Sequence, residues 1–187
     1  MGRGIARALG LAAGIAAAGC GRPRPAPSPA LHLVEKGPYQ ALYDGEGRLQ
    51  RVLYDRDGDG RADLVASYAR DGRLLRAEID IDGDGVVDRW EVFGAGGALE
   101  KVGVSRCRPG RPDEWWFPPD PSGIVRVERD EDGDGRVDHW IEQAGGRVVA
   151  EEFDTDGDGR PDRHLAGDAF SPARGPCVGI AAQGSRR

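Results

Sequence analysis

The sequence predicts an all-β protein, an antiparallel β-meander built from hairpins that repeat about every 25 residues. Three observations predict it. One nine-residue phrase, Asp-x-Asp-Gly-Asp-Gly-x-x-Asp, occurs four times, beginning at residues 55, 80, 130 and 154. The segments on both sides of each copy are short and rich in β-branched and aromatic residues. Glycine turns recur midway between the copies, so each repeat contains a turn, a strand, a loop and a returning strand.

The spacing of the loops predicts a fifth copy. The four starts are separated by 25, 50 and 24 residues, so a further loop is expected to begin at residue 105. Residues 105–113, SRCRPGRPD, keep Gly110 and Asp113 at loop positions 6 and 9 but have Ser, Cys and Pro in place of the first three aspartates. We interpret this segment as a degenerate repeat that binds no ion.

The strands before the loops alternate in character. Residues one, three and five positions before each loop are mostly apolar, as at Val52, Tyr54, Ala77 and Ile79, whereas the residues between them are mostly charged. A period of two predicts an antiparallel sheet with one face exposed to water. About ten or eleven strands are expected, including one near 38–43. Such a sheet should curl toward a barrel or be covered, and the sequence leaves both possibilities open.

The residues two positions after each nine-residue loop, at position 11 counted from its start, are mostly aromatic and are expected to form a column across the sheet. A platform that stacks on sugars or other ligands is one interpretation, and packing across neighbouring strands is the commoner role, which we favour. Likewise, the Trp-Trp-Phe run at 115–117 is either an exposed binding patch or part of the core of the degenerate repeat, and we favour the core. The column consists of Val65, Trp90, Trp115, Trp140 and His164.

The loops have the chemistry of a calcium site. Alternate residues of a tight loop point inward, and the glycine at position 6 permits the reversal that brings position 9 back to them. Ca²⁺ takes six to eight oxygen ligands. Solvated Asp-Gly turns are the alternative, but four copies of one ligand set favour about four bound Ca²⁺ ions. The expected ligands are Asp55, Asp57, Asp59, Arg61 and Asp63; Asp80, Asp82, Asp84, Val86 and Asp88; Asp130, Asp132, Asp134, Arg136 and Asp138; and Asp154, Asp156, Asp158, Arg160 and Asp162, the position-7 residues through their backbone carbonyls.

The copy at 80–88 continues to Glu91 at position 12 and so satisfies the full EF-hand pattern, whereas the others have Ala66, Ile141 and Leu165 there. The flanks look like strands instead of the helices of an EF-hand. The loops therefore resemble the calcium hairpin loops of integrin α-subunits and, more loosely, thrombospondin type 3 repeats and dockerins. The resemblance covers about nine residues per copy and implies that the position-9 aspartate replaces the terminal glutamate of an EF-hand.

The N-terminus predicts export. Residues 1–19 combine two arginines with an apolar stretch and are expected to be a signal peptide. The sequence Ala17-Ala18-Gly19-Cys20 resembles a bacterial lipobox, which implies lipidation of Cys20 and anchoring in the bacterial cell envelope, at the outer membrane. An ordinary cleaved secretory signal is the alternative.

The expected organisation downstream of the signal is simple. A lipid-anchored, Pro-rich tether spans 20–37, the repeat domain spans 38–167, and a C-terminal tail spans 168–187. An oxidising compartment permits a disulfide between Cys107 and Cys177 that would clamp the tail across the sheet, and two free thiols are the alternative.

The charge of the chain fits metal binding better than a basic partner. Without residues 1–19 the chain has 24 basic and 32 acidic residues, a net charge of −8, and sixteen of the acids are loop aspartates. Four Ca²⁺ ions would neutralise this charge, so we do not expect a nucleic-acid partner.

The sequence contains no motif of a known catalytic constellation, and its three histidines are scattered. We therefore expect a protein that is not an enzyme: a calcium-binding, membrane-tethered scaffold or interaction module with an unknown protein or glycan partner. A calcium-responsive switch or buffer and, less favoured, a hydrolase of envelope polymers are the alternatives. With 39% hydrophobic residues and 30 glycines the core should be thin, which predicts that calcium is required for folding.

Overall fold

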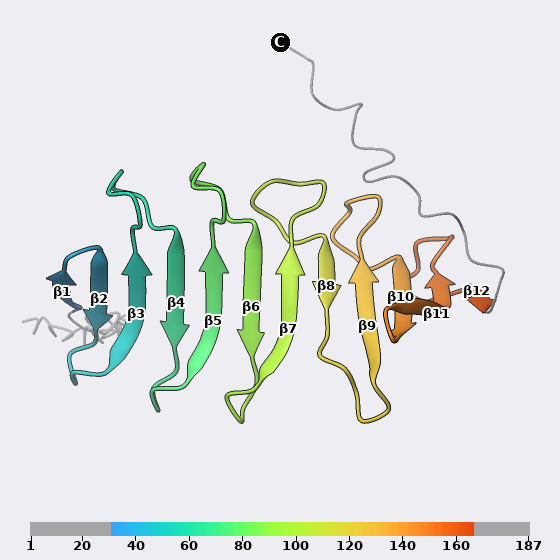
Figure 1. Ribbon diagram of the computed structural model, residues 1–187, viewed down its shortest axis with the longest axis horizontal. Helices are drawn as coiled ribbons and strands as arrows, with labels where there is room; N and C mark the ends of the chain where they lie inside the picture. Colours follow the sequence, from blue (N-terminus) through green and yellow to red (C-terminus); the bar gives the residue numbers. More distant parts are fainter. Residues whose placement is uncertain (1–30, 167–187) are drawn as a thin grey trace, which may run out of the picture.

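The computed structural model describes residues 31–166, which form a single β-sheet without helices. Twelve strands follow one another across the sheet in sequence order, and each pairs antiparallel with the next, so the all-β meander is confirmed (Figure 1). None of the described residues forms a helix with the length and hydrophobicity needed to cross a bilayer. The strands are β1 (His32–Lys36), β2 (Tyr39–Tyr43), β3 (Leu49–Tyr54), β4 (Leu64–Tyr68), β5 (Leu74–Ile79), β6 (Arg89–Phe93), β7 (Leu99–Val104), β8 (Glu114–Trp116), β9 (Ile124–Arg129), β10 (His139–Ala144), β11 (Arg147–Phe153) and β12 (Arg163–Ala166).

The two edges of the sheet that carry the connections differ in composition. The five nine-residue loops, including the degenerate one, lie along the upper edge in Figure 1, and the short glycine turns between repeats lie along the lower edge. The strand expected near 38–43 is β2. Residues 32–36, which the sequence placed in the tether, instead form β1 and pair with β2 across a turn at Gly37, where φ is +58°.

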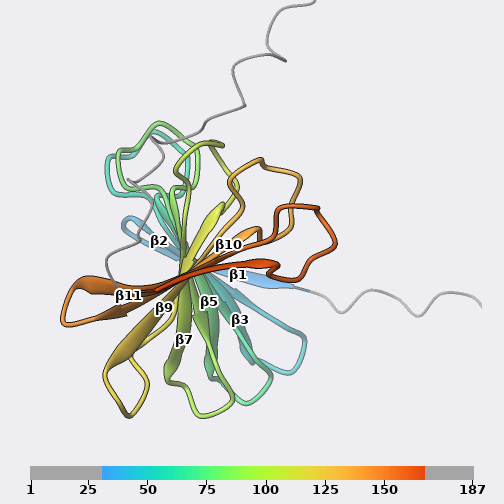
Figure 2. The same ribbon diagram turned by 90° about the vertical axis from the view of Figure 1, so that its right-hand side faces the viewer.

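The sheet is open and is not closed into a barrel, which was one of the two possibilities that the sequence left open. β1 and β12 stand at opposite ends of the strand order and pair with only one neighbour each. Viewed along the row of strands, the sheet is twisted, and successive strands are rotated relative to one another (Figure 2). Neighbouring strands in a sheet are typically rotated by roughly 20–25°, and this right-handed twist accumulates along the row.

The register aligns one row of residues across nine neighbouring strands. Val52, Ala66 and Ala77 occupy one row across β3, β4 and β5, and the same row continues through Glu91, Val102, Trp116, Val127, Ile141 and Glu151. Seven of the nine residues in this row are apolar, and only Glu91 and Glu151 are charged. Four of the five buried hydrophobic residues of the described chain, Ala66, Ala77, Val127 and Ile141, lie in it, so the row is mostly apolar, as the alternation predicts.

The aromatic column is real but discontinuous. Trp90, Trp115 and Trp140 lie in one row of the opposite face, separated by Gly103 on β7 and Glu128 on β9. Trp115 covers Gly103, because a Cβ atom placed on that glycine would lie 2.8 Å from Trp115 Cζ3. Lys101 Nζ lies 4.1 Å from the centroid of the Trp115 ring. These contacts favour packing across strands over a continuous stacking platform.

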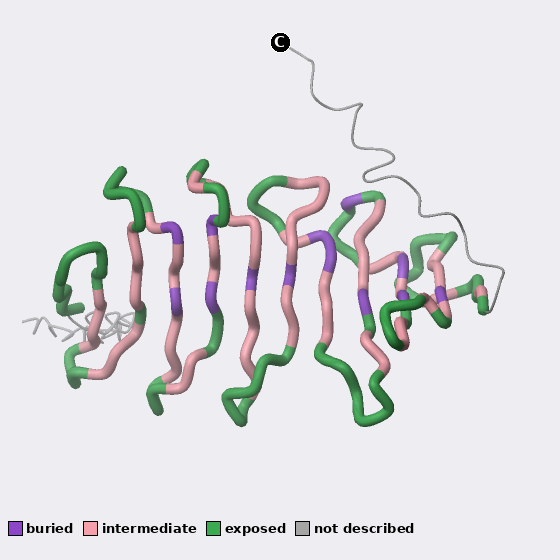
Figure 3. Tube along the Cα trace, viewed as in Figure 1, coloured by how far each residue is buried: buried purple, intermediate pink, exposed green. Residues whose placement is uncertain are grey.

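The hydrophobic core is small. In the described part of the chain the buried hydrophobic residues are Ala66, Ala77, Trp90, Val127 and Ile141, and Val127 has an exposed fraction of 0%. Figure 3 shows buried residues as isolated segments along the row of strands, with exposed turns on both edges. Residues 31–166 form a single layer of strands, so within this part of the chain side chains are covered by their neighbours in the sheet.

Candidate metal centres

The first aspartate of each acidic loop shapes the backbone around it. In the loop 80–88, Asp80 accepts hydrogen bonds from the backbone N–H groups of Gly83 and Gly85, both at 2.7 Å. Positions 4 and 6 have positive φ values between 78° and 97° in all four loops, which only glycine adopts without strain. The same pair of bonds closes loop 55–63 on Asp55 and loop 154–162 on Asp154.

The other aspartates extend this pattern. Asp82 at position 3 accepts from the N–H of Asp84 at 3.2 Å, and Asp84 at position 5 accepts from the N–H of Val86 at 2.7 Å. Asp88 at position 9 accepts from the N–H of Ile81 at 2.9 Å, which ties the end of the loop to its beginning. Each loop is therefore folded by bonds from its own backbone to its own carboxylates.

These bonds bring three carboxylates of each loop together at one point. In each of the four loops, the aspartates at positions 1, 3 and 9 offer oxygen atoms that all lie within 4.8 Å of one another. The position-5 aspartates are outside these groups, and ligation by the position-7 carbonyls stays a prediction. The groups are Asp55, Asp57 and Asp63; Asp80, Asp82 and Asp88; Asp130, Asp132 and Asp138; and Asp154, Asp156 and Asp162.

Two observations in the loop 130–138 indicate negative charge without compensation. Asp130 Oδ1 is buried and has no hydrogen-bond partner, whereas the matching oxygen of Asp80 accepts from a glycine N–H. Burial raises the pKa of Asp138 above its ordinary value, and the nearby carboxylates of Asp132 and Asp130 add to the effect. A hard divalent cation with oxygen ligands, such as Ca²⁺ or Mg²⁺, fits this donor set.

The loops do not all hold their carboxylates equally well. Burial alone would raise the pKa of Asp80, but the N–H groups of Gly85 and Gly83 outweigh it and lower that pKa. The pKa of Asp154 is lowered in the same way by Gly159 and Gly157. The loops 80–88 and 154–162 therefore favour an ionised first ligand before any cation arrives.

The degenerate loop 105–113 is closed by hydrogen bonds to Asp113 and from Ser105. Asp113, which is 4% exposed, accepts hydrogen bonds from the backbone N–H groups of Arg106, Cys107 and Arg108 at 2.8, 2.7 and 3.1 Å. Ser105 Oγ donates to the Arg108 carbonyl at 2.6 Å. Cys107 is disulfide-bonded, and its partner lies outside the described residues, as does Cys177.

A buried charged cluster lies beside this loop on the face of the sheet that carries Val127. Glu114, 5% exposed, accepts from Arg129 Nε at 2.6 Å and from Trp116 Nε1 at 2.6 Å, and Arg106 Nε is 3.3 Å away. Glu131 lies 3.3 Å from His139 Nδ1, and this hydrogen bond, with the charges of Arg106 and Arg129, lowers the pKa of Glu131.

This cluster was not predicted from the sequence. The residue before each loop was expected on an apolar face, although Arg129 stands there in its repeat, and His139 was given no role. The available signal was the set of opposite charges at Arg129 and Glu114, which become direct neighbours only when β8 and β9 pair. The ion pairs join the degenerate loop, through Arg106, to β8 and β9, the two strands that follow it.

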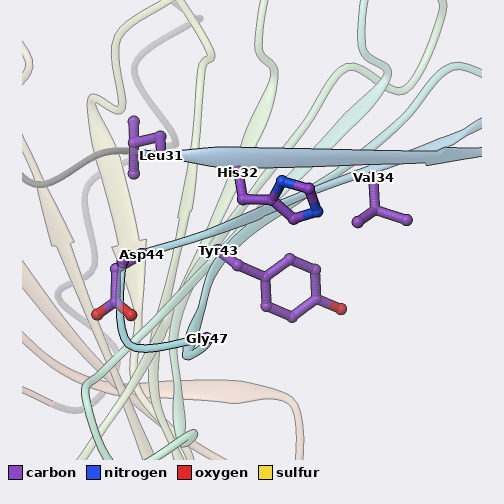
Figure 4. Close-up of a pocket in the computed structure, with 7 residues that line it drawn as sticks. Leu31, His32, Val34, Tyr43, Asp44 and Gly47 are labelled. Atoms are coloured by element: carbon purple, nitrogen blue, oxygen red, sulfur yellow. The ribbon is translucent and has the colours of Figure 1, made fainter.

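A shallow pocket opens near the N-terminal edge of the sheet, where Leu31, Val34 and Tyr43 line its apolar side (Figure 4). Asp44 is its acidic residue, but the Asp44 carboxylate accepts from the backbone N–H of Arg48 at 3.0 Å and from Arg48 Nε at 2.9 Å. These bonds also lower the pKa of Asp44. Asp44 therefore organises the turn before β3.

The predicted signal peptide, the lipidation site Cys20, most of the tether and the tail at 168–187 lie outside the described residues. No family model matches the chain, and no curated protein matches it. The site is therefore defined by its own geometry.

Proposed function

We propose that this protein is a calcium-stabilised β-repeat scaffold tethered to the bacterial cell envelope. One observation carries the proposal: four trios of converging carboxylates stand on one edge of a sheet whose described residues bury only five hydrophobic side chains. Without a cation, the carboxylates of each trio repel one another. With Ca²⁺ bound, each trio fixes the two ends of a hairpin loop.

The energies involved favour a structural role for the ions. A site with a dissociation constant of about 10 µM contributes roughly 2.7 kcal/mol of folding free energy at ~1 mM calcium. Four such sites contribute about 11 kcal/mol, which is comparable with the whole stability of a typical domain. A sheet with so little buried apolar surface depends on such a contribution.

Tethering follows from the lipobox-like sequence that ends at Cys20. Lipidation there would place the sheet at the outer membrane, on its periplasmic or surface face, where calcium is available and a protein or glycan partner would be met. In the Cys20→Ser variant we expect the protein to leave the membrane fraction. Continued membrane fractionation of that variant would contradict lipidation.

Thermal unfolding with and without EGTA tests the central proposal. We expect the midpoint to fall by tens of degrees when calcium is removed, because a loss of 1 kcal/mol shifts the midpoint by roughly 2–4 °C in a domain of this size. Calorimetric titration of the calcium-free protein should give about four ions per chain. An unchanged midpoint together with no heat of binding would refute calcium binding.

The same titration separates a scaffold from a switch or buffer. Sites that saturate well below ambient calcium stay loaded and act structurally. Sites whose midpoints fall within physiological variation of calcium would indicate a responsive protein.

A further inference from the structure

The side chain at loop position 7 leaves its own loop and lies on the next one. Arg61 Nη1 of the loop 55–63 donates to the carbonyl of Asp84 in the following loop at 3.3 Å. Arg136 Nη1 of the loop 130–138 donates to the carbonyl of Gly157 in its following loop at 3.1 Å. Both acceptors belong to the backbone that carries the acidic residues of the receiving loop.

The same direction of contact holds at the other two junctions between loops. Val86 Cγ1 lies 3.3 Å from the place where a Cβ atom of Gly110 would stand, and Arg111 Nη2 lies 3.5 Å from the corresponding place on Gly135. A Cβ atom on Gly85 would lie only 2.5 Å from Arg61 Nη1. The position-6 glycines of these receiving loops thus leave room for the side chain from the loop before.

The position-7 residue is also fixed from within its own loop. The backbone N–H of Arg61 donates to Asp59 at 2.7 Å, and that of Arg136 donates to Asp134 at 2.8 Å. A loop that is ordered by its own carboxylates therefore directs its arginine toward the backbone of its neighbour.

We propose that Arg61 and Arg136 are positioning residues for the cation sites of the following loops, 80–88 and 154–162. The inference rests on the proposed calcium binding. Arg61 donates to the backbone carbonyl of Asp84, an acidic residue of loop 80–88. Arg136 donates to the backbone carbonyl of Gly157, which lies between Asp156 and Asp158 in loop 154–162.

The sign of the effect distinguishes positioning from simple charge. A guanidinium beside a cation site repels Ca²⁺, so charge alone predicts that removal of the arginine tightens binding in the next loop. Positioning predicts weaker binding there. A hydrogen bond of this exposed kind corresponds to about a three- to tenfold change in affinity.

The test uses the full chain and follows each site separately by NMR during a calcium titration. The amides of Gly135 and Gly159 report on the two loops, because they donate to Asp130 and Asp154 at 2.9 and 2.6 Å. In Arg136→Ala we expect the Gly159 midpoint to rise about three- to tenfold, with the Gly135 midpoint unchanged. Arg136→Lys keeps a donor and should restore much of the affinity.

Arg70→Ala is the charge-matched control, because Arg70 lies in a glycine turn on the opposite edge of the sheet and its side chain is 76% exposed. This variant should leave both midpoints unchanged. Arg61→Ala, followed at Gly85 and Gly60, repeats the test at the first junction. If calcium still binds to Arg136→Ala and the Gly159 midpoint is unchanged or lower, the positioning role is wrong but the proposed function stands. If calcium shifts none of the four amide signals in the wild-type protein, both the positioning role and the proposed function are wrong.

Discussion

The degenerate loop 105–113 and the acidic loop 80–88 occupy equivalent places on one edge of the sheet but are closed by different chemistry. In the acidic loop, the position-9 carboxylate of Asp88 accepts one backbone N–H and faces two further carboxylates. In the degenerate loop, the position-9 carboxylate of Asp113 accepts three backbone N–H groups. The position-9 carboxylate is thus satisfied by the protein's own donors in the degenerate loop, whereas in the acidic loop it belongs to a group of carboxylates that could hold a cation.

The comparison extends to the surroundings of the two loops. Two arginines of the degenerate loop make contacts outside it: Arg106 Nε lies 3.3 Å from Glu114, and Arg108 Nη2 donates to the Asp132 carbonyl in the next acidic loop at 3.5 Å. Under the proposed function, metal-dependent loops therefore flank a metal-independent one in the middle of the sheet.

The largest expected difference concerns the position-9 aspartate. Asp113→Ala should lower the free energy of unfolding by about 3 kcal/mol, because it leaves three backbone N–H groups without their buried acceptor. The loss should be the same at two calcium concentrations at which the wild-type protein is folded. Urea unfolding curves measure it.

Asp88→Ala supplies the contrast. Its cost should grow with calcium concentration, because the wild-type protein gains binding free energy at that loop and the variant does not. Equal calcium dependence of Asp88→Ala and Asp113→Ala would remove the distinction between the two kinds of loop.

A smaller effect is expected in the strand that enters the degenerate loop. Gly103→Ala should cost about 2 kcal/mol, because the new Cβ atom would lie 2.8 Å from Trp115 Cζ3 and 2.9 Å from Pro112 Cβ. Gly96→Ala is the control, since a Cβ atom there meets nothing within 4 Å. At saturating calcium, the thermal unfolding midpoint of Gly103→Ala should be lower than that of Gly96→Ala. Equal midpoints would show that Trp115 moves aside freely.

The smallest effect concerns the glycine-turn edge of the sheet, far from the acidic loops. Hydrogen bonds from the Ser122 side chain and from the Ile124 N–H lower the pKa of Asp120 below its ordinary value. A lowered folded pKa stabilises the protein above about pH 4 and loses that contribution as pH falls through the folded value.

Asp120→Asn should therefore lose less stability than the wild-type protein on acidification from about pH 5 to pH 2, independently of calcium. The acidic loops should respond differently, because protonation of their ligands releases the ion. Unfolding free energies across this pH range, with and without excess calcium, would test the difference. A calcium-dependent effect of Asp120→Asn would contradict it.

Much of the fold was predictable because its signals are local and repeated. The 25-residue spacing identified the degenerate loop, and the alignment of the repeats placed Trp90, Trp115 and Trp140 in one row. Three of the four aspartates predicted as ligands in each loop, at positions 1, 3 and 9, form the trios, whereas the aspartate at position 5 lies outside them.

The features that were missed depend on which strands meet. The shared row of Ala77 and Glu91 shows that an apolar residue before a loop can neighbour a charged one after it, which periodicity within one strand does not reveal. The ion pair of Glu114 and Arg129 arises from β8–β9 pairing in the same way. β1 was missed because it follows a Pro-rich stretch and all its residues are exposed.

Because the strands follow one another in sequence order, the length of the sheet is proportional to the number of repeats. Each strand pairs only with the ones before and after it in the chain, and one hairpin repeat adds two strands at roughly 4.8 Å each. Duplication or deletion of one repeat would therefore change the separation of the two ends by about 10 Å while leaving every other pairing intact. The length of such a sheet can therefore change in evolution through the number of repeats, without redesign of a core.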